Sequence, residues 1–322
     1  MPPVSRQVAV SQAISSQVPG RIPFSVEFMP PRDDAAEERL WNCAEAFHDL
    51  GVSFCSITYG AGGSTQERTL RVASQLAAKP LTTLMHMTLV GHRRDELVEL
   101  IETFAKEGLS NLLALRGDPP GDPNAEWIPT EGGFTHAVEL IELVKQTEAT
   151  QHFDIGIASF PQGHYRAIDL EHDTKYTLEK LRAGAEFSIT QMFFDVDDYL
   201  RLRDRLAAAD PEFGAKPIIP GLMPITSIRG VRRQMELAGC SLPKPLEERL
   251  MKAAAGDEVG NAAAVREVGI EITTAMAERL ISEGAPDLHF MTMNNVHATQ
   301  DVLHNLGMAP AWGPDLGHDA VR

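Results

Sequence analysis

The chain has 322 residues, of which 43% are hydrophobic and 23% are charged. This composition excludes an intrinsically disordered protein and is sufficient for one large α/β domain or two smaller ones. With 29 basic and 45 acidic residues, the formal charge is −16. Neither a nucleic acid nor an anionic membrane is therefore expected as the main partner.

Two further classes of protein are disfavoured by the sequence. The first 20 residues lack the apolar core of a secretion signal, and no run approaches the roughly 18 apolar residues of a membrane span. The three cysteines, Cys43, Cys55 and Cys240, have no CxxC spacing, which argues against a disulfide framework and against a thiolate zinc site. We expect a soluble, cytoplasmic protein.

Short apolar runs alternate with longer segments of helical periodicity. The runs expected to be strands buried on both faces span residues 22–28, 52–58, 81–89, 111–115, 154–160, 187–193, 217–222 and 288–293. The helical segments include residues 38–50, 94–108, 174–184, 196–209 and 262–284, and Gly108 and Gly184 are predicted to end two of them.

Eight strands alternating with helices predict an α/β fold, a single-domain (β/α)8 TIM-type barrel spanning residues 21–307. A doubly wound open sheet is the competing fold. The chain contains neither GxGxxG nor GxxxxGK[ST], and YGAGGST at residues 59–65 lacks the third glycine in register.

The two chain ends and one loop fall outside this pattern. Residues 1–20 are expected to form a flexible N-terminal segment, and residues 308–322 a C-terminal tail. The segment 117–133, GDPPGDPNAEWIPTEGG, is rich in proline and glycine. So long a loop is typical of a lid or binding loop, with a surface insertion as the alternative.

Polar side chains recur where the apolar runs end, which is where such barrels carry their active sites. The residues at these ends are Glu27, Thr58, His86, Arg116, Gly117, Asp118, Phe160, Gln191, Met223 and Asn294.

Glu27 is the most informative of them, because it stands in SVEFMPP between Val26 and Phe28. In an apolar pocket, desolvation of the charged form raises the pKa of a carboxyl group and suits it to donating a proton. The alternative is a glutamate that caps a loop or pairs with an arginine.

Asp118 and Gln191 also have two interpretations each. Asp118 either pairs structurally with Arg116 or provides a fixed negative charge beside a ring system whose charge changes during reaction. Gln191 can donate and accept at once, as the amide edge of a flat heterocycle requires, or it bonds only to backbone. His86 and His164 have no metal-ligand spacing, and GxSxG is absent. The set suits a planar redox or one-carbon substrate better than hydrolysis.

Five motifs, in chain order, resemble those of 5,10-methylenetetrahydrofolate reductase of the bacterial single-domain type. They are SVEFMPPR (25–32), SITYGAGGST (56–65), LALRGDPP (113–120), AGAEFSITQMFFD (183–195) and LHFMTMNN (288–295). The resemblance implies a flavoprotein barrel that reduces methylenetetrahydrofolate to 5-methyltetrahydrofolate, a reaction of one-carbon metabolism and methionine biosynthesis. NAD(P)H would give a hydride to FAD and leave, and the folate would then take its place.

The resemblance also assigns roles to residues. Glu27 corresponds to the general acid for iminium formation, Asp118 to a catalytic aspartate near the flavin that also binds the pterin, and Gln191 to the reader of the pterin edge. Further substrate contacts are implied at Asn294, Asn295 and Ile228. Cofactor contacts are implied at Thr58, His86, Arg116, Gly117, Asp118, Phe160, His164, Asp173 and Lys180, and no metal is implied.

The sequence departs from the family pattern at several of these places. Tyr176 and Glu179 stand where bacterial relatives often have an Asn and an Arg that hold the adenine dinucleotide, and Glu179 beside a diphosphate would be repulsive. Ile228 and Asn295 replace a phenylalanine and an arginine of some relatives. The acid and pterin residues therefore match the family better than the flavin contacts do.

Two other functions stay open at this point. One keeps the same folate reduction without bound flavin, the hydride coming directly from NADH or a deazaflavin. The other is a non-catalytic folate- or flavin-binding barrel, which has no need of Glu27 as an acid. The sequence is compatible with a homo-oligomer and does not choose between NADH and NADPH.

Overall fold

The computed structural model describes residues 7–15, 22–59, 63–119, 125–240 and 242–310. Its strands pair in parallel in the order β7-β6-β5-β4-β3-β2-β1-β9-β8. They are β1 (Phe24–Phe28), β2 (Cys55–Ile57), β3 (Thr83–Thr88), β4 (Asn111–Leu115), β5 (Asp154–Ser159), β6 (Phe187–Thr190), β7 (Ile218–Ile219), β8 (Gly221–Leu222) and β9 (Leu288–Met291).

One short run closes this sheet into a barrel. Residues 218–219 pair with β6, and residues 221–222 pair with β9. Pro220, which has no N–H to donate, separates the two strands, but its carbonyl accepts a hydrogen bond from His289 N at 3.0 Å. The predicted TIM-type barrel is therefore confirmed, with the seventh predicted strand split in two at the proline.

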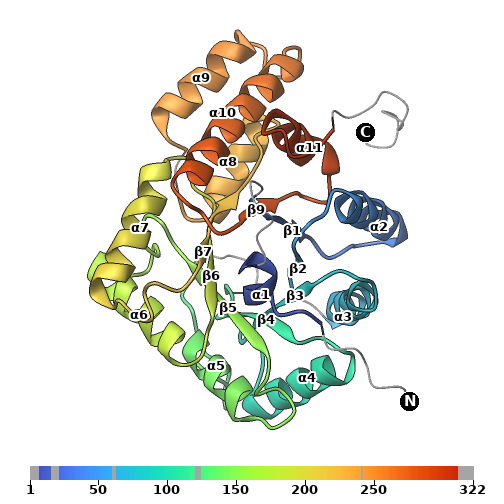
Figure 1. Ribbon diagram of the computed structural model, residues 1–322, viewed down its shortest axis with the longest axis vertical. Coiled ribbons are helices and arrows are strands. Elements are labelled where there is room, and N and C mark those ends of the chain that lie inside the picture. Colours follow the sequence, from blue (N-terminus) through green and yellow to red (C-terminus); the bar gives the residue numbers. More distant parts are fainter. Residues whose placement is uncertain (1–6, 16–21, 60–62, 120–124, 241, 311–322) are drawn as a thin grey trace.

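Helices surround the strands on the outside (Figure 1). They are α2 (Asp34–Asp49), α3 (Gly63–Ala77), α4 (Arg94–Lys106), α5 (Ala137–Gln146), α6 (Leu170–Arg182), α7 (Val196–Ala209), α8 (Ile228–Leu237), α9 (Lys244–Ala254), α10 (Ala262–Ser282) and α11 (Val296–Asn305). All five predicted helical segments are helices. Gly108 and Gly184 follow α4 and α6 with φ of +83° and +119°, conformations that favour glycine.

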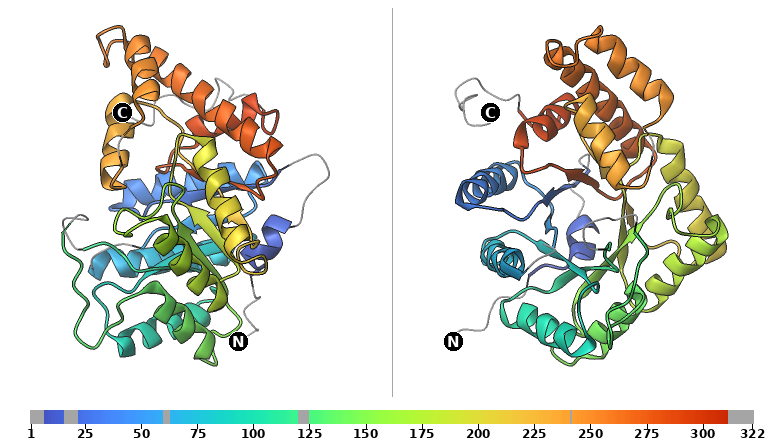
Figure 2. Two further views of the ribbon diagram at one scale, coloured as in Figure 1. Left: turned by 90° about the vertical axis from the view of Figure 1, so that its left-hand side faces the viewer. Right: turned by 180° about the vertical axis from the view of Figure 1, so that it is seen from behind.

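A small helix, α1 (Val10–Ser15), lies within the ring of strands in Figure 1. Val10 and Ile14 are buried against residues from β3, β4, β6 and β7. Asn111 Oδ1 accepts from Val10 N at 3.1 Å, and Asp154 Oδ2 accepts from Ser11 N at 2.7 Å. Because Asn111 and Asp154 begin their strands, α1 covers the amino-terminal end of the barrel. Figure 2 (left) shows α1 at the end opposite residues 125–133.

This packing differs from the expected flexible segment over residues 1–20. Residues 7–15 are held because two buried side chains and two side-chain acceptors fix them, while residues 1–6 and 16–21 lie outside the described part of the chain. At the other end, Met308 and Ala309 pack against the main core, and residues 311–322 lie outside the described part.

We predict that Asn111→Ala lowers the free energy of unfolding by about 1–3 kcal/mol, since it leaves buried backbone groups of α1 without partners. Asn111 is 1% exposed and its Nδ2 donates to Val8 O at 3.1 Å. Urea unfolding measures the change. Val8→Ala is the control, because Val8 is 50% exposed. An equal loss of unfolding free energy in Asn111→Ala and Val8→Ala would contradict the conclusion that Asn111 fixes α1 at the end of the barrel.

Candidate functional site

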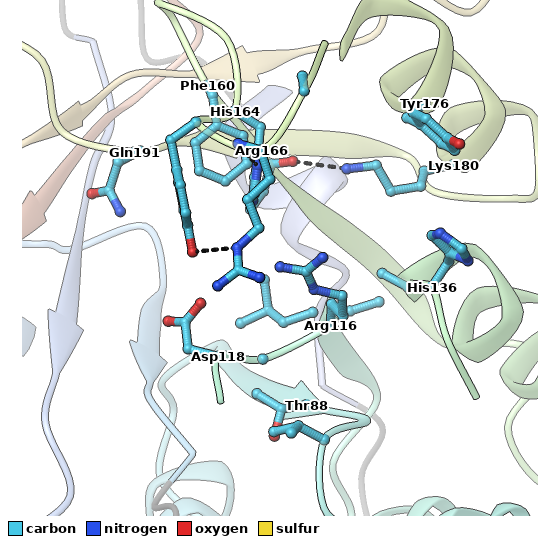
Figure 3. A pocket seen from close by; sticks show the side chains of 18 of the residues that line it. Thr88, Arg116, Asp118, His136, Phe160, His164, Arg166, Tyr176, Lys180 and Gln191 are labelled. Atoms are coloured by element: carbon cyan, nitrogen blue, oxygen red, sulfur yellow. Dashed lines mark hydrogen bonds between the residues drawn. The ribbon is translucent and has the colours of Figure 1, made fainter. Parts of the chain in front are cut away.

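A large cavity lies at the carboxyl ends of β3, β4 and β5 and is flanked by α5, α6 and the end of α8. Its volume is ≈ 830 Å³. Three cationic side chains line it, Arg116, Arg166 and Lys180, together with the carboxyl groups of Asp118 and Asp173 (Figure 3). The cavity is therefore locally basic within an acidic protein, which suits an anionic small molecule.

The chain leaving β4 forms one wall. Gly117 has φ +85°, and a Cβ atom there would lie 2.5 Å from Val90 Cγ1, so only glycine fits. Its carbonyl accepts a hydrogen bond from Trp127 Nε1 at 3.2 Å, and Arg116 lies over the Trp127 ring at 5.2 Å. Through these two contacts, Trp127 joins the long loop to the cavity wall. Residues 120–124 of that loop lie outside the described residues.

The turn after β5 adds aromatic and cationic groups. The ring of His164 packs edge-on against Phe160 at 4.6 Å and stacks on Tyr165 at 4.7 Å. Burial, reinforced by nearby Arg116, lowers the pKa of His164 to about 4, so its ring is neutral at pH 7. Arg166 Nη2 donates to Ala125 O at 2.6 Å, which links this turn to the long loop.

Helix α6 lines the cavity with an ionisable pair. Asp173 Oδ1 accepts from His164 N at 3.1 Å, and Lys180 Nζ donates to Ala158 O at 3.1 Å. Burial lowers the pKa of Lys180 to about 8, an effect opposed by Asp173, so the ammonium form prevails at pH 7. Among the described residues, His172 Nδ1 and Asp173 Oδ2 are buried without a hydrogen-bond partner.

Tyr176 and Glu179, the two residues of α6 that depart from the family pattern, lie in different surroundings. Tyr176 lines the cavity, where its ring stacks on His136 at 5.9 Å and meets His172 edge-on at 4.6 Å. Glu179 is not among the described residues that line it, and its carboxylate lies 3.9 Å from Lys175 Nζ. The repulsion expected from Glu179 therefore acts outside the cavity wall.

Asp118 and Gln191 line the same cavity. In Figure 3 they lie on the opposite side of the view from Tyr176 and His136. Gln191 Oε1 accepts a hydrogen bond from Met192 N at 2.8 Å. The cavity thus has an amide and a carboxyl group at one end and a stacked aromatic pair at the other.

Glu27 lies on β1, outside the described lining of this cavity, and its side chain is 18% exposed. Its Oε2 atom is 3.8 Å from His86 Nε2 and 4.0 Å from His289 Nε2. Burial raises the pKa of Glu27 to about 7 and lowers the pKa of both histidines to about 3. At pH 7 a half-protonated carboxyl group therefore faces two neutral imidazoles.

The other residues singled out by the sequence are dispersed. Thr58 and His86 do not belong to the described cavity lining, and Ile228 is 1% exposed. The Asn294 amide is engaged with the backbone of Met29, accepting from its N at 2.8 Å and donating to its O at 2.9 Å. A second hollow of ≈ 240 Å³, between the ends of β8 and β9, is lined by residues that include Met223 and Asn295.

Sequence reasoning missed several residues of the site. Arg166 follows the expected strand over residues 154–160, whereas His136 immediately precedes α5, a helix that was not predicted from the sequence. His289 alternates with Leu288 and Phe290 inside a buried strand. A polar residue on the inward face of a strand was the signal that could have revealed it.

Two searches of the described residues complete the inventory. No group of three or more His, Cys, Asp or Glu side chains in the described ranges could hold a metal ion. No helix within those ranges is long and apolar enough to cross a membrane.

Comparison with known proteins gives a consistent result. The family model for methylenetetrahydrofolate reductase matches residues 11–307. The 5,10-methylenetetrahydrofolate reductase of Escherichia coli is 31% identical over 309 residues, which cover 95% of this chain and 97% of that protein. Methylenetetrahydrofolate reductase (NADH) 1 of Arabidopsis thaliana is 31% identical over 90% of this chain. The chain spans about half of that plant protein, 49% of its length.

A solved structure adds a likeness in fold. It is an uncharacterised protein from Clostridium thermocellum described as binding two copies of 5-methyl-5,6,7,8-tetrahydrofolic acid. The TM-score is 0.59 at 14% identity, over 92% of this chain and 96% of that one. The motif-based resemblance to the reductases is thus confirmed by the sequence comparisons, and this structure supports the fold.

The raised pKa of Glu27 predicts a pH-dependent stability difference. Between pH 4.5, the ordinary pKa of a glutamate, and about 7, the folded state binds more protons at Glu27 than the unfolded state, so this residue lowers stability as the pH rises. Relative to wild type, Glu27→Gln should therefore gain about 2–3 kcal/mol in unfolding free energy between pH 5 and pH 8.

Urea unfolding at both pH values measures this difference, with the exposed Glu278→Gln as the matched control. A difference between wild type and Glu27→Gln that stays constant with pH would show that the Glu27 carboxyl group is not perturbed.

Proposed function

The chain belongs to the methylenetetrahydrofolate reductase family, and we propose that it reduces 5,10-methylenetetrahydrofolate to 5-methyltetrahydrofolate with hydride from NAD(P)H by way of bound FAD. The observation that carries the proposal is Glu27, a carboxyl group desolvated at the end of β1, in a barrel whose mouth also presents Asp118 and Gln191. A barrel that only bound folate would have no use for such an acid.

Several features of the large cavity support FAD as the bound cofactor. Its volume of ≈ 830 Å³ is in the range of small-molecule and cofactor sites. The cationic groups of Arg116, Arg166 and Lys180 suit an anionic diphosphate. His172 Nδ1, on its wall, is buried without a hydrogen bond and is what a ligand with polar edges would complete, whereas Asp173 Oδ2 lies 3.9 Å from Arg205 Nη2.

The residues present therefore fit FAD, and the same cationic side chains, with Phe160 and His164, would hold it. When bound, FAD supplies a store for the hydride between its donor and its acceptor. The protein contributes position, electrostatics and the exclusion of water.

The proton chemistry falls to Glu27. Conversion of a 5,10-methylene bridge to a 5-methyl group requires the bond from the bridge carbon to N10 to break while the bond to N5 stays. A proton from the Glu27 carboxyl group to N10 makes that nitrogen a better leaving group, and the electron pair of the broken bond stays on N10. The bridge carbon becomes an iminium with N5 and accepts the hydride. A pKa of about 7 leaves Glu27 able to regain its proton after each turnover.

Asp118 and Gln191 are the residues that we assign to the pterin. The amide of Gln191 can donate and accept along the edge of a pyrimidinone ring, and the Asp118 carboxylate can accept from its amino group. The same carboxylate provides a negative charge beside the cofactor when hydride leaves it. Both roles require the two residues to face one cavity, as they do.

Electron donation from NADH is in line with the plant relatives, whose names include NADH. The alternative of flavin-free reduction was motivated by Tyr176 and Glu179. The position of Glu179 near Lys175, away from the cavity wall, reduces the force of that argument. Tyr176, stacked on His136, offers an aromatic surface instead.

Visible absorption of the purified protein distinguishes the two routes. We expect bands near ~450 and ~380 nm that bleach with NADH under anaerobic conditions and return on addition of methylenetetrahydrofolate. A colourless protein that still reduces the folate would overturn the role of FAD and move the hydride donor to a diffusible carrier.

Glu27→Gln should slow folate reduction by about 10²–10⁴-fold, because glutamine has no proton to give. Reduction of bound flavin by NADH needs no acid and should change by less than about 3-fold. Stopped-flow measurement of the two half-reactions separates them, with Glu278→Gln as the control. Folate turnover close to wild type in Glu27→Gln would refute the assignment of the acid.

A further inference from the structure

A buried polar network lies beneath Glu27 inside the barrel. Ser25 on β1 is the register partner of His289 on β9, and the Ser25 Oγ atom is 2.8 Å from His289 Nδ1. The same hydroxyl donates to Asp287 Oδ1 at 2.5 Å. Ser25, Asp287 and His289 are all 0% exposed. Such a group of polar side chains costs desolvation energy, which only specific hydrogen bonds offset.

The network ends at the proposed acid. On the far side of its ring, His289 Nε2 lies 3.3 Å from Ser56 Oγ and 4.0 Å from Glu27 Oε2. The ring plane is fixed by Phe54, which stacks on it at 5.4 Å with an interplanar angle of 13°. His289 thus has one nitrogen facing Ser25 and the other facing Glu27.

Counting hydrogens determines which nitrogen of His289 carries the proton. Ser25 has a single hydroxyl hydrogen and gives it to Asp287 Oδ1, so its oxygen must accept from His289 Nδ1–H. Burial lowers the pKa of His289 to about 3, so the ring is neutral and carries only this one proton. Nε2 is therefore a bare acceptor that faces Ser56 and Glu27.

The result holds when Asp287 is ionised and when it is protonated on Oδ2. Burial raises the pKa of Asp287 to about 6, against the effect of its serine hydrogen bonds. Ser53 Oγ lies 2.6 Å from Asp287 Oδ2 and 2.8 Å from Phe24 O. Ser53 donates to Oδ2 when Asp287 is ionised and accepts from it when Asp287 is protonated. In both states Oδ1 accepts from Ser25.

We infer that Asp287, Ser25 and His289 form a positioning relay that holds the lone pair of His289 Nε2 toward Glu27 and thereby favours the protonated, proton-donating form of the Glu27 carboxyl group. A lone pair beside a carboxylate repels it, whereas the same lone pair can accept from a carboxylic acid. A ring held in the other tautomer would direct an N–H at Glu27 and favour the carboxylate. The relay rests on the proposed function of Glu27 as general acid.

Within the described residues, the groups around Glu27 carry no charge, and Ser56 Oγ, 3.3 Å from His289 Nε2, shares the same lone pair. From β3, His86 faces Glu27 with a neutral ring, from β9 His289 does so, and β2 contributes the uncharged Ser56. Asp287 is the other ionisable group of the network and bonds to Ser25 and Ser53. No lysine or arginine in the described ranges forms an ion pair with Glu27 or Asp287.

Nitrogen-15 NMR of the imidazole rings tests the relay without reference to activity. The signal of His289, one of 11 histidines, is identified by its loss in His289→Gln. We expect the Nδ1–H tautomer in wild type and the Nε2–H tautomer in Ser25→Ala, which removes the acceptor for Nδ1–H. A wild-type ring with the proton on Nε2 would overturn the inference.

The pH dependence of folate reduction tests the consequence for the acid. In Ser25→Ala the decline of kcat at high pH should move about one pH unit lower, giving about 10-fold slower turnover at pH 8 and little change at pH 5.5. Ser188→Ala is the matched control, since Ser188 is 1% exposed on β6 and bonds to Ser159. An unshifted profile in a folded Ser25→Ala protein would overturn the relay.

Failure of the relay and failure of the proposed function are distinguishable. If wild type does not reduce the folate, the proposed function fails. The relay can still be tested by the tautomer of His289 and by the pH-dependent difference in unfolding free energy between wild type and Glu27→Gln. A smaller stability difference in the Ser25→Ala background would support it. An equal difference in both backgrounds would count against it.

Discussion

The closed parallel barrel imposes one constraint from which the rest of the site follows: polar side chains that point inward are largely removed from water and must find their partners inside the barrel. Closure depends on a run of five residues around Pro220 that pairs with β6 on one side and with β9 on the other. Once the ring is closed, Ser25, Glu27 and His289 are brought to the same interior. Glu27 is then buried among described neighbours that carry no charge, and burial raises its pKa to about 7.

The electrostatics of the two halves of the barrel mouth are complementary. Over β4, β5 and α6, Arg116, Arg166 and Lys180 concentrate positive charge in a protein that is acidic overall. Over β1 and β9 there is no cation beside Glu27 in the described residues, and the local groups are neutral rings and hydroxyls. The cationic groups and the Glu27 carboxyl group thus lie over different strands of one barrel mouth.

Much of this fold could be predicted from sequence, since strands buried on both faces are continuous apolar runs and helix ends are marked by glycines such as Gly108 and Gly184. The strand-end rule also located Glu27, Asp118 and Gln191. The relay could not be predicted, because the contacts of Asp287 and His289 with Ser25 depend on the strand register that places Ser25 opposite His289. Helix α1 was missed for a similar reason. Six residues show no periodicity, and the partners of α1 lie more than 100 positions away.

That separation along the chain has a consequence for the order in which the molecule assembles. Ile219, in the cluster that buries Val10 and Ile14, follows α1 in the chain by some two hundred residues. The helix can therefore dock fully only after nearly the whole ring exists, and such distant contacts form slowly. Helix α1 therefore reaches its final packing late, after β7 has taken its place in the barrel.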